Sequence, residues 1–150
     1  MRTRIQHTLT MLICLAYAPW SMAALGAGPD SVDADQLHFK SERRDSVQSG
    51  YQTHELTSPT GTVVREYTDA TGHVFAVSWR GSHLPDLRQL LGVSYMRFTA
   101  AAQVPHGGHT ALLVHDNDLV IESTGRMRSF AGRAYLPGAM PIGVAQDAIH

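Results

Sequence analysis

Three segments rich in β-branched and aromatic residues follow one another between residues 51 and 80, and they constrain the fold more than any other feature. Residues 51–57, 62–68 and 73–80 are predicted strands, separated by two sequences typical of four-residue turns. Strands joined by tight turns favour an antiparallel meander. In the third strand, strict alternation would place Phe75, Val77 and Trp79 together on the core side.

Helical patterns flank this meander. Residues 31–48 carry a thin apolar stripe among many charges, which indicates an amphipathic helix, and Gly50 is placed to end it. Residues 85–91 predict a short helix, since Leu87, Leu90 and Leu91 form one apolar face. Pro85 and Asp86 both suit its beginning.

The remaining half of the chain reads mostly as strands. The fold class that we expect is α+β: an antiparallel sheet of about six to seven strands, a meander and then a hairpin, with one N-terminal helix and one short central helix packed on it. Residues 137–144, with two prolines and two glycines, are expected to lie extended on the surface. The further predicted strands are residues 93–102, 111–115, 119–123 and 127–136.

The first 23 residues have the three-part pattern of a secretory signal peptide. Arg2 and Arg4 precede an apolar core over residues 9–18, and Ala23 ends a small-residue cleavage site. This core is too short to span a bilayer. We therefore expect a signal peptide over 1–23, a flexible start and amphipathic helix over 24–50, and an α+β domain over 51–150 that forms a single domain with that helix.

Cleavage at this position would leave a protein without cysteine, because Cys14 is the only one in the chain. Thiol catalysis, disulfides and thiolate metal sites are then excluded. The mature chain would carry 10 basic residues (12 less Arg2 and Arg4) and 13 acidic ones, a net charge of −3. This excludes a generic electrostatic nucleic-acid binder. The expected location is the periplasm, with secretion as the alternative, and no transmembrane span remains after cleavage.

Motifs for nucleophilic catalysis and phosphate binding are absent from the sequence. His54 and Glu55 begin like a zinc-protease motif, but the fifth position is Ser58 and the segment reads as a strand. A pairing of Thr57 with Thr62 would bring Glu55 and Glu66 to one side of the sheet, where two carboxylates could act in glycoside hydrolysis. The alternative is that both glutamates are ordinary surface residues of their strands, with Arg65 as a cross-strand partner.

Histidines and arginines give two further candidate sites. His106 and His109 lie in a Gly-rich loop and, with His115, could bind Zn²⁺ or Cu²⁺; the alternative is that they are solvated loop residues. Near the end of the chain, a locally basic strand could hold a carboxylate, a phosphate or a sugar acid beside an aromatic ring, or it could simply be a solvated face. Its candidate ligand-binding residues are Arg126, Arg128, Phe130 and Arg133.

Several blocks of sequence together resemble a known family. They are residues 61–67, 72–81 and 85–92, followed by 118–121 and 125–137. In this order they are similar to the exported bacterial family catalogued as domain of unknown function 2844, over nearly the whole chain after residue 23. The resemblance implies a real export signal and a complete domain. It implies no activity and no site residue.

The interpretation that these observations favour is a non-catalytic binding or interaction module of the bacterial envelope. Its partner would be an envelope protein or a small ligand, with no cofactor and no nucleic acid. One alternative is an envelope hydrolase that uses Glu55 and Glu66 or the loop histidines. The other alternative is a metal-binding protein that uses His106, His109 and His115.

Overall fold

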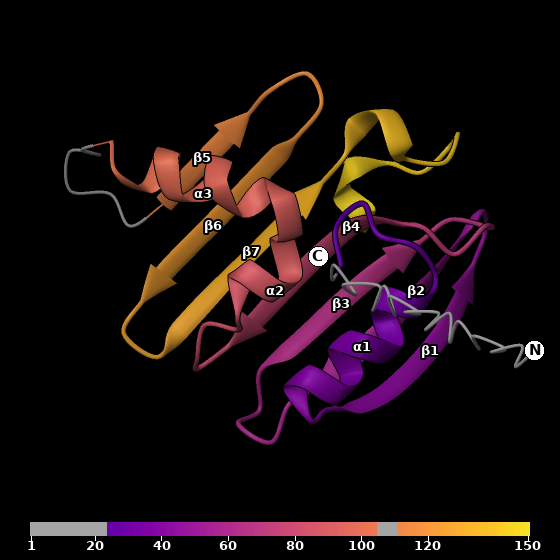
Figure 1. Ribbon diagram of the computed structural model, residues 1–150, viewed down its shortest axis with the longest axis horizontal. Coiled ribbons are helices and arrows are strands. Elements are labelled where there is room, and N and C mark those ends of the chain that lie inside the picture. The colour runs from indigo at the N-terminus through magenta and orange to yellow at the C-terminus, as the bar shows by residue number, and fades with distance from the viewer. Residues whose placement is uncertain (1–23, 105–110) are drawn as a thin grey trace, which may run out of the picture.

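The computed structural model describes residues 24–104 and 111–150 and contains a seven-stranded antiparallel sheet (Figure 1). The strand order is β1-β2-β3-β4-β7-β6-β5, so the meander of the first four strands is followed by a hairpin and a last strand that returns beside β4. The predicted α+β class is confirmed. The strands are β1 (Glu42–Gln48), β2 (Tyr51–Thr57), β3 (Val63–Thr68), β4 (Val74–Gly81), β5 (Ala111–His115), β6 (Val120–Arg126) and β7 (Ser129–Tyr135).

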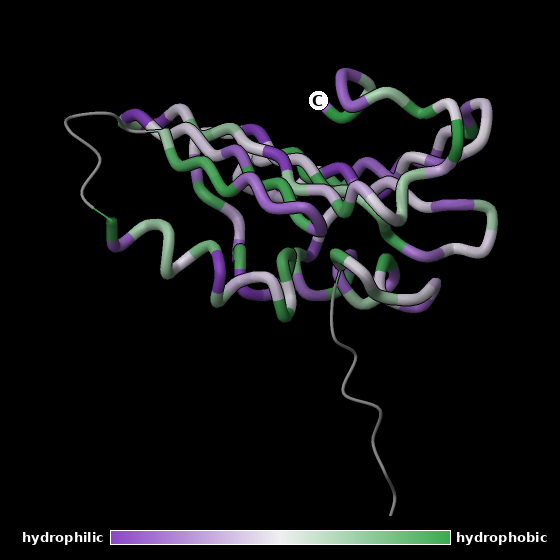
Figure 2. The backbone as a smooth tube through the Cα atoms, turned by 90° about the horizontal axis from the view of Figure 1, so that it is seen from above, coloured by the Kyte–Doolittle hydropathy of each residue, from purple (hydrophilic) through white to green (hydrophobic). Residues whose placement is uncertain are grey.

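The two faces of the sheet are covered differently (Figure 2). The helices α1 (Asp30–Phe39), α2 (Leu87–Leu91) and α3 (Tyr95–Ala102) cover one face, called here the helix face. Residues 136–150, called here the C-terminal segment, cross the opposite face, called here the back face. Each face therefore has its own hydrophobic core, and the larger one lies under the helices. Short 3-10 turns occur at Gly92–Ser94, Pro137–Ala139 and Gln146–Ala148.

The helix predicted over residues 31–48 is only half present. It ends at Phe39, where Lys40 adopts a left-handed conformation with φ 50° and its N–H bonds the carbonyls of Gln36 and Leu37. The second half of the predicted helix is the edge strand β1, which pairs with β2 over its whole length. The apolar stripe was too thin to extend the helix, because Val32 is the only apolar residue that α1 buries fully.

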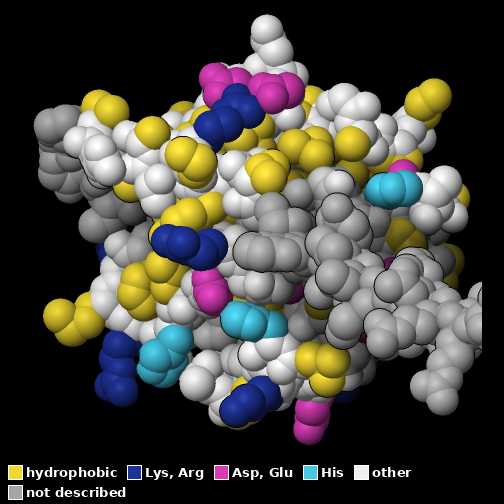
Figure 3. All heavy atoms as spheres, in the orientation of Figure 1, with side chains coloured by type: hydrophobic (Ala, Val, Ile, Leu, Met, Phe, Trp, Pro, Cys, Tyr) yellow, Lys and Arg dark blue, Asp and Glu magenta, His cyan; other side chains and the backbone are white. Residues whose placement is uncertain are grey.

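The strand predicted over residues 93–102 is wrong, since this segment forms a 3-10 turn and the helix α3. Tyr95, Phe98 and Ala101 recur every three residues and pack against the main core, a spacing that suits a helix. The guanidinium of Arg97 binds Asp116 and Asp118, which fastens α3 to the β5–β6 turn. Figure 3 shows a basic side chain flanked by acidic ones at the end of the molecule where the β5–β6 turn lies.

A β-bulge corrects the predicted facing of β4. Tyr67 pairs with Ala76 but Thr68 pairs with Val74, so Phe75 is the extra residue of the pair of strands. Beyond the bulge, Val77 and Trp79 face the helices, whereas Phe75 lies in the core of the back face. The expected common face of Phe75, Val77 and Trp79 is therefore wrong.

The start of the described chain is held against the sheet. The N–H of Gly26 donates to the carbonyl of Val74, and the N–H of Val74 donates to the carbonyl of Ala27. Leu25 is buried in the main core, so this part of the expected flexible start is ordered. The expected signal peptide, residues 1–23, lies outside the described residues. None of the helices within the described ranges is long and apolar enough to cross a membrane.

Candidate functional site

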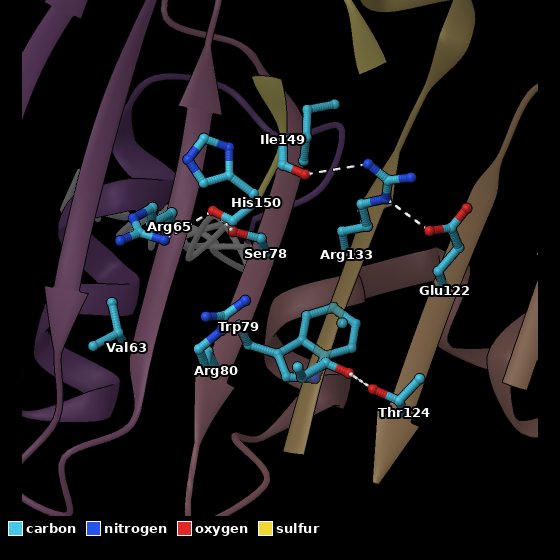
Figure 4. A pocket seen from close by; sticks show the side chains of 12 residues that line it. Val63, Arg65, Ser78, Trp79, Arg80, Glu122, Thr124, Arg133, Ile149 and His150 are labelled. Atoms are coloured by element: carbon cyan, nitrogen blue, oxygen red, sulfur yellow. Dashed lines mark hydrogen bonds and ion pairs between the residues drawn. The ribbon is translucent and has the colours of Figure 1, made fainter. Parts of the chain in front are cut away.

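A cavity of about 250 Å³ lies on the back face, over strands β3, β4, β7 and β6 (Figure 4). Arg80 and Thr124 in its wall are exposed, so solvent reaches it. The volume lies below the range of about 300–1,000 Å³ that is typical of sites for drug-sized ligands, which favours a small ligand. Its wall contains Val63, Arg65, Ser78, Arg80, Glu122, Thr124, Ala131, Arg133, Ile149 and His150.

The register of the sheet places the charged residues in one row across five strands. Glu55 pairs with Arg65, which pairs with Ser78; Ser78 pairs with Arg133, and Arg133 pairs with Glu122. Paired residues of neighbouring strands point to the same face, so the row presents two guanidiniums flanked by two carboxylates. A serine hydroxyl lies between the two guanidiniums. The next row contains Val63, Arg80, Ala131 and Thr124.

Each guanidinium of the first row donates hydrogen bonds both to a carboxylate and to the main chain of the C-terminal segment. Arg65 donates to Oε2 of Glu55 at 2.9 Å and to the main-chain oxygen of His150 at 2.8 Å. Arg133 donates to Oε2 of Glu122 at 2.8 Å and to the main-chain oxygen of Ile149 at 3.3 Å. Figure 4 shows Arg65 and Arg133 on either side of residues 149 and 150.

The ion pair between Arg133 and Glu122 persists across the neutral pH range. The hydrogen bond from Arg133 lowers the pKa of Glu122, and the hydrogen bond to Glu122 raises the pKa of Arg133. Arg65 and Glu55 form a similar pair, so the first row contains two positive and two negative charges. The row by itself therefore carries no net charge.

Arg80 in the second row breaks this balance. It is exposed, and within residues 24–104 and 111–150 no hydrogen bond or ion pair engages its guanidinium. It lies beside Ala131 and Val63, whose side chains are apolar. Counted over the side chains of the two rows, the cavity therefore has a surplus of one positive charge, and the guanidinium of Arg80 can attract a ligand with a negative charge.

A second polar cluster lies on the helix face, between α1 and the sheet. Asp35 and Glu66 are fully buried there, and Gln89 of α2 donates to Asp35 at 2.6 Å. Burial, and then the charge of Asp35, raise the pKa of Glu66 to about 9. His54 nearby bonds Asp45 at 2.8 Å and Thr68 at 3.0 Å. Since the two carboxyl groups do not contact solvent, a substrate does not reach them in this structure.

The structure separates the two carboxylates that the sequence suggested as a pair. Thr57 pairs with Val63, one residue beyond the expected partner Thr62. A slip of one residue reverses the facing of a strand, so Glu66 pairs with His54 and points to the helices, while Glu55 lies on the back face with Arg65. The expected common side of Glu55 and Glu66 is wrong, and they cannot act together on one substrate.

The four candidate ligand-binding residues of the last hairpin are not brought together. Arg133 lines the cavity, whereas Arg128 lies exposed in the β6–β7 turn, with φ 61°. Arg126 ends β6, two residues beyond Thr124. Phe130 is three residues from Arg133, so strand alternation places it on the opposite face, where it lies against Gly125.

The candidate metal ligands are placed only in part. His106 and His109 lie outside the described residues. His115 is exposed on β5, with Nε2 3.4 Å from Oε1 of Glu122. Among the residues that the structure describes, no group of three or more His, Cys, Asp or Glu side chains could hold a metal ion. The metal-binding alternative therefore stays a prediction.

Sequence reasoning did not single out Ser78 and Arg80, and it treated Arg65 only as a partner for a glutamate. The row that they form with Arg133 depends on the order β3-β4-β7-β6, which joins residues far apart in the chain. One signal was present in the sequence: Arg65 and Arg80 are charged residues inside segments that are otherwise rich in strand-forming side chains.

Comparison with known proteins identifies the family of the chain alone. A family model described as "Protein of unknown function (DUF2844)" matches residues 21–149. No curated protein and no solved structure matches the chain. The site is therefore interpreted from its own geometry.

Proposed function

Because this chain belongs to the DUF2844 family of proteins of unknown function, whose description carries no activity, we propose a function from the cavity itself. The protein is a non-catalytic binding module that holds a small organic carboxylate on the back face of its sheet. The signal-peptide pattern of residues 1–23 supports a location in the bacterial envelope, where such a ligand would be met outside the cytoplasm.

The single observation that carries this proposal is the guanidinium of Arg80, which no described residue pairs with, in a cavity beside two neutralised ion pairs. A singly charged carboxylate neutralises this surplus positive charge, whereas a doubly charged phosphate would leave one negative charge uncompensated. Guanidinium binds carboxylate through two parallel N–H donors, which gives direction as well as affinity. Ser78, Thr124 and the imidazole of His150 supply further polar groups for hydroxyls, as on a sugar acid.

We expect the purified protein to bind glucuronate, and Arg80→Gln to weaken that binding roughly 10-fold or more, as loss of a hydrogen bond to a charged group does. Isothermal titration calorimetry measures both affinities. Arg128→Gln is the matched control, because it removes the same charge from an exposed turn outside the cavity. Glucose, which lacks the carboxylate, should bind at least 10-fold more weakly than glucuronate.

Three results would contradict the proposal. The first is an Arg80→Gln variant that binds glucuronate as tightly as the unchanged protein. The second is equal binding of glucose and glucuronate. The third is the absence of glucuronate binding at millimolar concentration.

A further inference from the structure

The C-terminal segment fills one end of the groove in which the cavity lies. The side chain of Ile149 is buried in the core of the back face with Tyr67, Phe75 and Tyr135. The main chain on both sides of it is held by side chains of the sheet, as a bound peptide would be. Arg133 bonds the carbonyls of Gln146 and Ile149 at 2.9 and 3.3 Å.

The strongest of these contacts is made to the main-chain oxygen of His150. Arg65 donates to it at 2.8 Å, the hydroxyl of Tyr67 at 2.9 Å and the hydroxyl of Ser78 at 3.1 Å. Tyr67 and Ser78 are each 3% exposed, so the sheet fixes the positions of both hydroxyls. We refer to these three side chains as the oxygen cradle.

The oxygen cradle suits an anion, because one of its three donors is the guanidinium of Arg65. A carboxylate has about four acceptor sites on two oxygens and accepts charge-assisted bonds from guanidinium. The cradle also adjoins the cavity, since Arg65 and Ser78 line both.

The main-chain oxygen of His150 lies at the point where the three donors of the oxygen cradle converge. A ligand oxygen that accepts from the same donors would have to take its place. This mutual exclusion makes the C-terminal segment a competitor of any ligand that reaches the same donors.

We propose that Arg65, Tyr67 and Ser78 form a carboxylate-binding subsite, and that residues 144–150 occupy it as an internal competitor which the ligand displaces. This inference rests on the proposed function, because it names further donors that would bind the carboxylate together with Arg80. The ligand oxygen takes the place of the His150 oxygen, and the segment leaves the groove at that end.

Competition of this kind has a measurable consequence for affinity. The apparent dissociation constant equals the intrinsic one divided by the fraction of molecules in which the subsite is free. A change that loosens the segment without touching the cavity must therefore tighten ligand binding. Two anchors of the segment lie outside the cavity: Gln146, which accepts from the hydroxyl of Tyr135 at 3.0 Å, and Val144, which packs against the back-face core.

The test compares the double variant Val144→Ala/Gln146→Ala with the unchanged protein, using glucuronate as the probe in calorimetry. We expect the double variant to bind roughly three- to tenfold more tightly. Ile142→Ala is the matched control: Ile142 is in the same segment but fully exposed, so its loss should leave the affinity unchanged. Tyr135→Phe removes the hydroxyl that holds the side chain of Gln146, so this variant should also bind glucuronate more tightly.

Hydrogen–deuterium exchange measures directly whether the C-terminal segment leaves the sheet, which an affinity does not. The N–H of His150 donates to the hydroxyl of Tyr67 at 3.1 Å, and the N–H of Ile149 donates to the carbonyl of Gln146. Glucuronate should speed the exchange of a peptide covering residues 144–150, although ligand binding usually slows exchange elsewhere. Unchanged or slower exchange at saturation, with equal affinities in all variants, overturns the displacement but leaves the proposed function intact. Absence of binding by every variant overturns both.

Discussion

Replacing Gly132 with alanine is expected to destabilise the protein by about 2 kcal/mol or more, although alanine normally improves the interior of a strand. A Cβ at position 132 would lie 2.3 Å from Cζ2 of Trp79 and 2.6 Å from the main-chain oxygen of Glu122. Trp79 is 2% exposed and packs in the main core, so its ring cannot move aside without opening that core. Urea unfolding measures the change.

Gly138→Ala is the control for this prediction, because no atom lies within 4 Å of a Cβ added at Gly138. It should change stability by less than about 0.5 kcal/mol. The clash also predicts coupling between the two residues: Gly132→Ala should cost less in a Trp79→Leu background than in the unchanged protein. A Gly132→Ala variant as stable as the unchanged protein would contradict this packing.

Replacing Glu66 with glutamine is expected to stabilise the protein by about 1–3 kcal/mol at pH 7 and above. Glu66 is fully buried, and neither of its carboxyl oxygens has a hydrogen-bond partner within the described parts of the chain. Folding at neutral pH therefore keeps a proton on this carboxyl that the unfolded chain releases. Glutamine has nearly the same shape and carries no charge, so the cost disappears.

The direction of the pH dependence follows from the raised pKa of Glu66, which is about 9 in the folded protein against 4.5 ordinarily. Protonated Glu66 contributes its full stability below about pH 4.5, and this contribution is lost as the pH rises to about 9. The unfolding free energies of Glu66→Gln and the unchanged protein should therefore meet near pH 4 and separate above it.

Chemical unfolding between pH 4 and pH 9 tests this separation. Glu55→Gln is the matched control on the other face. It breaks the partly exposed pair with Arg65 and the long, exposed pair with Arg44, so it should cost no more than about 1 kcal/mol and should not stabilise at any pH. A Glu66→Gln variant that is less stable than the unchanged protein at pH 8 would contradict the burial of a protonated carboxyl here.

Local patterns were sufficient to predict the elements whose stabilising contacts are local. The β-branched and aromatic residues of 51–57 and 73–80 predicted β2 and β4 to within one residue at either end. The short helix before Gly92 was also found, because Asp86 caps it by accepting from the N–H groups of Arg88 and Gln89. The α+β class followed from these elements and the order in which they occur.

Register was harder to predict, because it depends on single residues in the turns. The N–H of Ser58 bonds the carbonyl of Thr62, so the loop between these two residues has three members and ends at Gly61, with φ 79°. A sequence of four turn-forming residues suggested a loop of four. That difference of one residue sent Glu66 to the helix face and removed the expected pair with Glu55.

The candidate site could not be assembled from sequence for a related reason. Arg65 and Arg133 belong to one row only because β7 inserts beside β4, and no local pattern indicates which strand a last strand will join. The contribution of Ile149 and His150 was missed for the same reason, since the surface segment expected over residues 137–144 gave no sign that the following residues pack on the sheet. Tertiary contacts between distant residues decide both features.

Nuclear magnetic resonance of the arginine side chains tests most directly whether the back-face cavity binds a carboxylate. The Nε–Hε signals of the protein would be followed during titration with glucuronate. We expect the signals of Arg80 and Arg65 to shift and saturate together, at the dissociation constant found by calorimetry, while that of Arg128 stays in place. A titration in which Arg126 and Arg128 shift and Arg80 does not would contradict the account, because the ligand would then lie at the β6–β7 turn.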